Sequence, residues 1–159
     1  KSLLRHKKAV SKLVDFGPGS SFKRVLPDDG CSVDGKEVQK VILCSGKIFF
    51  DLVATREEKE IHNVAVVRVE QYYPFPKISL SRELEKYPNA KVIWCQEEPK
   101  NMGAWTFMDR RIEELLLTLD VLAKRPIYVG RPESASPATG SNARHIREQG
   151  KLIDDALTV

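Results

Sequence analysis

Two hydrophobic patterns alternate along the chain: short continuous apolar runs, and longer stretches in which apolar residues recur at helical spacing. The short runs predict β-strands at residues 22–26, 40–45, 64–70, 91–96 and 126–130. The later runs are almost uninterrupted, which is typical of strands that helices cover on both faces of a parallel sheet. We therefore expect a largely parallel sheet with a buried middle.

The longer stretches predict helices at residues 47–60, 78–87, 103–119 and 141–157. The third is the clearest, because its apolar residues form one stripe: Met108, Ile112, Leu115, Leu116 and Leu119. In the last helix, we expect the apolar side to hold Ile146, Ile153, Ala156 and Leu157. Strands that alternate with helices of this length predict an α/β fold, a three-layer sandwich with right-handed crossovers.

The first part of the chain has a different composition. Residues 1–21 are basic and weakly patterned, and they end in a Gly-Pro-Gly-Ser-Ser run that is typical of a connecting segment. We therefore divide the chain into an interdomain linker at 1–21 and one α/β domain at 22–159. With 159 residues, 42% of them hydrophobic, the chain is long enough for one compact core. The linker suggests that the chain is a piece of a longer protein.

The net charge of +4 is local, because residues 1–50 hold ten Lys or Arg against five Asp or Glu. A solvated linker and a contact with a polyanion would both explain these cations. No aromatic residues alternate with them as stacking platforms for bases, which disfavours a nucleic-acid-binding protein. No stretch approaches the ~18 apolar residues that a membrane helix requires.

Three cysteines, Cys31, Cys44 and Cys95, form no CxxC pair and have no histidine at metal-ligand spacing. Cys44 and Cys95 lie inside predicted strands, so we expect them to be buried and inert, whereas Cys31 in a polar segment should be exposed. Unpaired cysteines favour a reducing compartment. The sequence predicts neither a catalytic relay nor a metal site.

Functional loops in open α/β sheets leave the carboxyl ends of the strands, and the first of these is Ser45-Gly46-Lys47. It joins a predicted strand directly to a predicted helix, so it offers free backbone N–H groups, the positive end of a helix dipole and a lysine. These features suit a phosphate or a carboxylate. A plain tight turn is the alternative, and the P-loop pattern GxxxxGK[ST] is absent.

Three further loops follow predicted strands. Residues 71–76 hold three aromatics and two prolines, which predicts a rigid loop that either packs over the domain's own helix or contacts another domain. Residues 96–103 place Glu97 and Glu98 ahead of a helix, and acid–base chemistry and simple stabilisation by the helix dipole are the alternatives there. Residues 131–140 are rich in small residues and proline, as in a lid or a docking edge.

Several sequence blocks resemble one enzyme family: KSLLRH, VILCSGKIFFDL, VAVVRVEQYYPFP, VIWCQEEPKNMGAW, YVGRPESASPATGS and KLIDDAL. In this order they are similar to the C-terminal part of the decarboxylating component of 2-oxoglutarate dehydrogenase (succinyl-transferring), bacterial type. The resemblance covers essentially the whole chain. It implies the transketolase C-terminal fold, with a five-stranded mixed sheet of order 1-3-2-4-5 and one antiparallel edge strand, the first.

A full-length member of that family is an oxidoreductase that acts on an oxo acid with a disulfide acceptor. It decarboxylates 2-oxoglutarate on thiamine diphosphate and magnesium, and it passes the succinyl group to a lipoyl-bearing succinyltransferase in a multienzyme complex of the tricarboxylic acid cycle. The resemblance implies a homodimer in the bacterial cytoplasm, or in the mitochondrial matrix of a eukaryote. The family's GDG diphosphate motif is absent from this chain, so we expect the chain alone to be inactive and to bind no cofactor.

The resemblance thus implies a structural and assembly role within the longer enzyme. We expect an edge that faces the thiamine-binding domains, made by Tyr72, Tyr73, Phe75, Glu97, Glu98, Asn101, Trp105 and Arg131. The alternative is a regulatory module in which Ser45, Gly46 and Lys47 bind an anionic effector, such as a nucleotide or a coenzyme A ester.

Overall fold

The computed structural model describes residues 3–158 of the chain. Its elements are two 3-10 helices (Leu3–Arg5 and Leu13–Phe16), the strands β1 (Val25–Leu26), β2 (Lys40–Cys44), β3 (Val64–Val69), β4 (Lys91–Pro99) and β5 (Ile127–Arg131), and the helices α1 (Ile48–Glu58), α2 (Lys77–Leu84), α3 (Trp105–Leu116) and α4 (Asn142–Leu157). Each strand and helix that the hydrophobic pattern predicts is present. Within the described range, no helix is long and apolar enough to cross a membrane.

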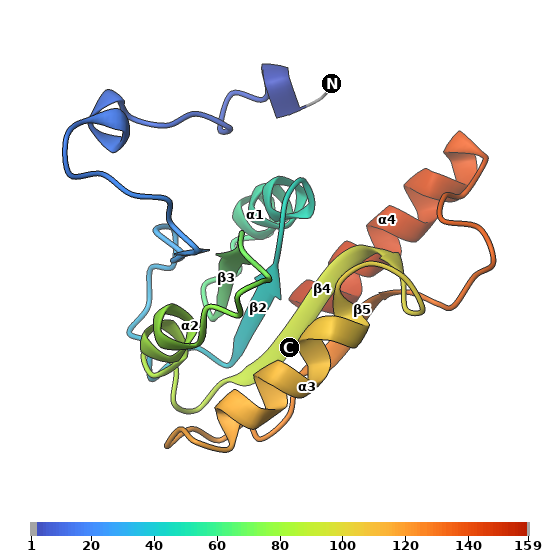
Figure 1. Cartoon of the computed structure of the whole chain (residues 1–159). Helices are drawn as coiled ribbons and strands as arrows, with labels where there is room; N and C mark the ends of the chain where they lie inside the picture. The colour runs from blue at the N-terminus through green and yellow to red at the C-terminus, as the bar shows by residue number, and fades with distance from the viewer. Residues whose placement is uncertain (1–2, 159) are drawn as a thin grey trace.

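The five strands form one mixed sheet in the order β1-β3-β2-β4-β5. β2, β3, β4 and β5 run parallel, and β1 pairs antiparallel with β3 at the edge (Figure 1). In the middle of the sheet, Ile42 of β2 lies opposite Val66 of β3 and Ile93 of β4. The strand order and the antiparallel edge strand are those that the resemblance implied.

Helices cover both faces of the sheet, because side chains that alternate along each strand point to opposite sides. α1 and α4 pack on the face that carries Ile42, Val66 and Ile93, and α2 and α3 pack on the face that carries Leu43 and Trp94. Figure 1 shows the sheet between these two helical layers. The structure thus confirms the three-layer α/β sandwich.

Two burial predictions are wrong. The hydrophobic pattern predicts that β5 is covered on both faces, but none of its residues is buried, because β5 is an edge strand with β4 as its one neighbour. Helical spacing places Ile146 on the buried side of α4, yet its side chain is 63% exposed. The buried residues of α4 begin at Leu152, so only the C-terminal part of this helix reaches the core.

The segment before β1 lies outside the sheet and its two helical layers (Figure 1), and it contacts α1, where the ring of His6 lies 4.7 Å from that of Phe50. Its two 3-10 helices contain no buried residue, and its large apolar side chains are exposed: Leu4, Val10, Leu13, Val14, Phe16 and Phe22. Residues 1 and 2 of the predicted linker lie outside the described residues. The division into a linker at 1–21 and a domain at 22–159 stays a prediction.

A buried ion pair lies beside β1. The side chains of Arg56 and Asp28 are 4% and 3% exposed, and the guanidinium binds both oxygens of the carboxylate. Asp28 Oδ2 also accepts a hydrogen bond from the backbone N–H of Val66 at 2.7 Å, in the part of β3 beyond its pairing with β1. Arg56 donates to the carbonyl oxygen of Val64 at 3.0 Å. The pair therefore joins α1, β3 and the loop after β1.

A second buried charge ties the last helix to the central strand. The ammonium of Lys40, at the start of β2, donates to the carbonyl oxygens of Ala156, at 2.9 Å, and of Thr158. Burial, together with the nearby charge of Lys91, lowers the pKa of Lys40. Carbonyl groups at a helix C-terminus lack partners within the helix, so Lys40 supplies the missing donor.

Candidate functional site

The carboxyl ends of the parallel strands meet at one edge of the sheet. The turn at 45–47, the loops at 71–76 and 96–103, and the segment after β5 all begin there. Two features make up this edge: an aromatic groove beside α3, and a polar network beside α4.

The aromatic groove is lined by Tyr72, Tyr73, Trp94, Ala104 and Phe107, among others, and has a volume of about 350 Å³. The rings of Tyr72 and Trp94 meet edge to face, with their centroids 5.9 Å apart. The side chain of Tyr73 is 79% exposed. The groove is therefore an open surface with large aromatic side chains, which is typical of protein contact sites.

The polar network begins at Lys47, at the start of α1. Its Nζ lies 2.5 Å from Asp51 Oδ2 and 3.4 Å from Glu97 Oε1, and Gln149 of α4 donates to the same two oxygens at 3.0 Å each. Burial by itself would lower the pKa of Lys47, but its hydrogen bond with Asp51 and the charge of Glu97 outweigh burial and raise that pKa. These contacts join α1, β4 and α4.

The turn that carries the predicted anion site has the tight form expected of it. Gly46 has a φ of +70°, and no heavy atom lies within 4 Å of the position a Cβ would take. Burial raises the pKa of Tyr72, and a hydrogen bond with Ser45 opposes that shift. Because Lys47 is already paired with two carboxylates, a phosphate would compete with them. The anion site stays a prediction, which binding of phosphate-bearing effectors with and without Lys47→Ala would test.

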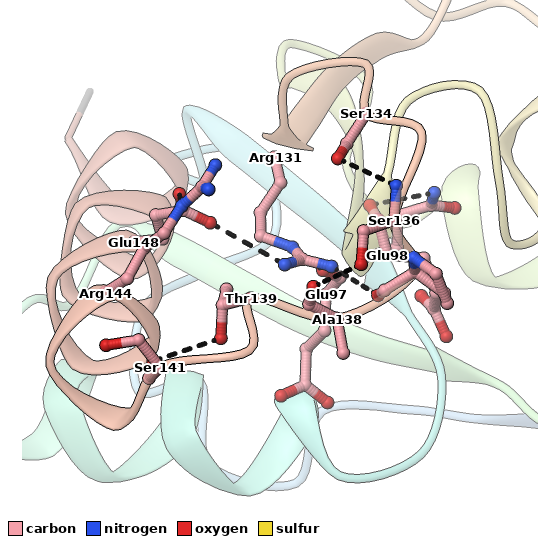
Figure 2. A network of polar contacts seen from close by, with 12 residues as sticks. Glu97, Glu98, Arg131, Ser134, Ser136, Ala138, Thr139, Ser141, Arg144 and Glu148 are labelled. Carbon is pink, nitrogen blue, oxygen red and sulfur yellow. Dashed lines mark hydrogen bonds and ion pairs between the residues drawn. The ribbon is translucent and has the colours of Figure 1, made fainter.

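Arg131, the last residue of β5, holds the segment that follows it (Figure 2). Its Nε donates to the carbonyl oxygen of Glu97 at 2.8 Å, and its Nη2 to that of Pro137 at 2.7 Å. Its Nη1 lies 3.6 Å from Glu148 Oε2, while Arg144 pairs with the other oxygen of Glu148 at 2.5 Å. The hydrogen bond from Arg144, reinforced by Arg131, lowers the pKa of Glu148. Arg131 therefore braces β4, α4 and the segment between β5 and α4.

Asn101 links the loop at 96–103 to that same segment. Its Nδ2 donates to the carbonyl oxygen of Ser134 at 3.0 Å, and the backbone N–H of Ser134 donates to its Oδ1 at 3.1 Å. Glu97 and Glu98 lie in different surroundings, since Glu97 is bound within the polar network and Glu98 is exposed. In residues 3–158, no group of three or more His, Cys, Asp or Glu is placed to hold a metal ion.

The eight residues predicted to form the edge differ in their exposure. Four are exposed at the surface, two are partly buried in the polar contacts just described, and two pack into the domain's own core. Trp105 is 9% exposed, with its ring 5.3 Å from that of Tyr128, and Phe75 packs half-buried against the same core. Trp105 thus lies at the start of α3 but packs into the core, because the first turn of α3 directs this side chain toward the sheet. The exposed four are Tyr72, Tyr73, Glu98 and Asn101.

Sequence reasoning missed residues that shape this edge from inside. Gln96 is 4% exposed beneath the groove, and Gln149 completes the polar network. Gly130 lets β5 approach β4 closely, because a Cβ there would lie 2.4 Å from Tyr128 Oη and 2.8 Å from the carbonyl oxygen of Gln96. A glycine inside a strand pattern is a recognised signal of such an approach. The two glutamines carry no comparable signal.

The three thiols differ in burial. Cys44 and Cys95 are buried, as predicted, and burial raises the pKa of Cys44 well above its usual value and that of Cys95 to about 12. Cys31, predicted to be exposed, is half-buried, because its loop packs against the core and its Sγ lies 3.8 Å from the carbonyl oxygen of His62.

We expect a thiol-reactive dye to label Cys31 in the native protein while Cys44 and Cys95 react at least ~100-fold more slowly, since the thiolate is the reactive form. Time-resolved mass spectrometry of the labelled chain checks this. Labelling in denaturant, where all three thiols should react, is the control. Equal rates in the native protein would contradict the assigned burial.

The comparisons with known proteins agree with the fold and the sequence blocks. A family model described as "2-oxoglutarate dehydrogenase C-terminal" matches residues 10–157. The chain belongs to this family. It is 45% identical over 165 residues to the "2-oxoglutarate dehydrogenase E1 component" of Brucella abortus (strain S19), and 45% identical over 166 residues to the protein of the same name from Brucella ovis.

Each of these alignments covers 99% of the chain and 16% of the relative. The chain therefore spans about one sixth of the length of the 2-oxoglutarate dehydrogenase components that it matches. Its family membership confirms the resemblance read from the sequence blocks, and the matched part is the C-terminal part of such a component.

Proposed function

We propose that this chain is the C-terminal assembly part of a longer 2-oxoglutarate dehydrogenase. The longer enzyme would decarboxylate 2-oxoglutarate on thiamine diphosphate and magnesium, and would pass the succinyl group to a lipoyl-bearing succinyltransferase. The support is the family match together with the name that the Brucella relatives carry. As a bacterial enzyme of the tricarboxylic acid cycle, it would act in the cytoplasm as a homodimer.

Within that enzyme, the edge at the carboxyl ends of the strands would pack against the domains that bind thiamine diphosphate. One observation carries this role: the aromatic groove keeps Tyr73 at 79% exposure and Tyr72 at 36%, side by side in the loop just before Pro74. Exposed aromatic clusters of this kind mark surfaces that other protein parts cover. Asn101 and Glu98 would form the polar rim.

The docking role is tested with the longer enzyme divided into this chain and the remainder. We expect Tyr73→Asp to weaken binding of the chain to the remainder by about 2 kcal/mol or more, as for an aromatic anchor placed in an interface. Isothermal titration calorimetry measures the affinity. The matched control is Leu122→Asp, since Leu122 is a similarly exposed apolar residue. Its backbone N–H donates to the carbonyl oxygen of Pro88, at the other end of the sheet. Equal affinities of the unchanged chain, Tyr73→Asp and Leu122→Asp for the remainder would refute docking at this groove.

The described residues do not fit thiamine diphosphate with magnesium. The GDG motif is absent, and within residues 3–158 no cluster of carboxylate, histidine or thiol ligands is placed around a common point. We therefore assign no catalytic step to this chain. The cofactor would be held by the remainder of the longer enzyme.

A direct consequence is that titrating the chain with thiamine diphosphate and magnesium should give no saturable heat, because magnesium requires several oxygen ligands around one point. The undivided enzyme, titrated under the same conditions, is the positive control. Magnesium-dependent saturation by the chain alone would show that a cofactor site exists here.

A further inference from the structure

The side-chain amide of Gln96 lies beneath the aromatic groove and is bonded on both of its ends. Its Oε1 accepts hydrogen bonds from Trp94 Nε1 at 3.0 Å and from the backbone N–H of Trp105 at 2.9 Å. Trp105 begins α3, so its N–H is one of the groups that a helix leaves without an internal partner. The oxygen of Gln96 therefore joins β4 to the start of α3.

The nitrogen of the same amide holds the loop between these elements. Nε2 donates to the carbonyl oxygens of Met102 at 2.7 Å, Pro99 at 3.2 Å and Glu98 at 3.3 Å. A primary amide is the side-chain group that offers both an acceptor oxygen and two N–H donors. An ionised carboxylate of the same size would keep the acceptor and would repel the three carbonyls.

The backbone closes tightly around this amide. Gly103 has a φ of +67°, and a Cβ there would lie 2.8 Å from Gln96 Nε2 and 3.0 Å from the Cβ of Glu98. The pairing of β4 with β5 also shifts register between Cys95 and Pro99. The loop is thus wrapped around Gln96 rather than held by regular strand pairing.

Both sides of the aromatic groove rest on this one side chain. Trp94, bonded to the oxygen of Gln96, meets Tyr72 edge to face. Gly103 and Ala104, which lead into α3 and line the other side, follow the carbonyl of Met102 that the nitrogen binds. A change at Gln96 therefore reaches the groove through two separate sets of bonds.

We propose that Gln96 is the positioning residue of the docking edge: its oxygen holds Trp94 and the start of α3, and its nitrogen holds the turn at 98–102 that leads into α3. This inference rests on the proposed docking function. Gln96 itself is buried and acts through the residues that it holds.

The test separates the two ends of the amide. Gln96→Glu keeps the acceptor and removes the donors, whereas Gln96→Met removes both at similar volume. Two hydrogen-exchange probes report the two sides: the indole N–H of Trp94, and the backbone N–H of Met102, which donates to the carbonyl oxygen of Pro99. The control is the same pair of substitutions at Gln39, an exposed glutamine bonded to Asn63 near the start of β2.

We expect Gln96→Glu to speed exchange at Met102 about tenfold or more, the size of a lost buried hydrogen bond, while exchange at Trp94 changes by less than about twofold. Gln96→Met should speed both. Gly103→Ala leaves Gln96 in place and crowds its nitrogen, so it should also speed exchange of the Met102 N–H. This variant serves as the test if Gln96→Glu does not fold. The separate roles of the oxygen and the nitrogen would be overturned if Gln96→Glu and Gly103→Ala speed exchange equally at Trp94 and Met102. They would also be overturned if neither variant changes exchange at either probe.

Affinity for the remainder of the longer enzyme then distinguishes this inference from the docking function. Gln96→Glu should weaken binding about tenfold if the shape of the turn matters for docking. If the Gln96→Glu variant keeps full affinity for the remainder while the Tyr73→Asp variant loses it, the positioning role of Gln96 is overturned and the docking function stands. Full affinity in Tyr73→Asp would overturn the docking function itself, whatever the exchange rates show.

Discussion

Replacing Asp28 by alanine should lower the free energy of unfolding by about 3–5 kcal/mol, the range for removing one partner of a buried ion pair. The substitution leaves the guanidinium of Arg56, which is 4% exposed, without its carboxylate. It also leaves the backbone N–H of Val66 without an acceptor. A buried charge and a buried donor would then both lack partners, and each is costly.

Urea denaturation followed by circular dichroism measures this loss. Asp29→Ala is the matched control, since Asp29 is the exposed neighbour of Asp28 and its removal should change stability by less than about 0.5 kcal/mol. The double variant Asp28→Leu with Arg56→Met should be more stable than either single variant, because it removes both charges together. A loss below about 1 kcal/mol in Asp28→Ala would show that the pair contributes little.

Replacing Ile112 by alanine should cost about 2–5 kcal/mol, because the side chain is fully buried in α3 and its removal leaves a cavity. The same substitution at Ile146 should change stability by less than about 0.5 kcal/mol, because that side chain is 63% exposed in α4. Both positions lie in helices and lose the same atoms. The pair therefore isolates the effect of burial from that of helix propensity.

Thermal and urea unfolding of the two variants give the comparison. A large loss in Ile146→Ala would mean that the N-terminal half of α4 is covered, as its hydrophobic spacing predicts. A small loss in Ile112→Ala would contradict the packing of α3 on the sheet.

The hydrophobic pattern was sufficient to locate the elements, because their periods are local properties of the chain. β2, β3 and β4 carry continuous apolar runs and are buried. β5 carries a similar run and is half-exposed, since its place at the sheet edge depends on strand order rather than on its own residues. The strand order itself came from the family resemblance. The local sequence therefore predicts which strands and helices form, whereas predicting how deeply each strand is buried requires the strand order.

In the candidate site, too, the local sequence predicts some features, while others depend on the folded chain. Pro74 and Pro76 predict a rigid aromatic loop at Tyr72 and Tyr73, but the sequence leaves open whether the domain's own helix covers it. The role of Gln96 could not be predicted, because its five partners become neighbours only once the chain at the end of β4 folds back over this side chain. The burial of Trp105 could not be predicted for a related reason: a position near a loop does not tell which way the first turn of a helix faces.

The two borders of the sheet differ in how open they are to another extended chain. On the β1 side, the N–H of Val66, beyond the end of β1, is occupied by the carboxylate of Asp28, so an incoming strand would find a donor already used and a charge beside it. Such inward-pointing charges are a known means of keeping sheets from joining edge to edge. Asp28 therefore also limits the sheet to its own strands on this side.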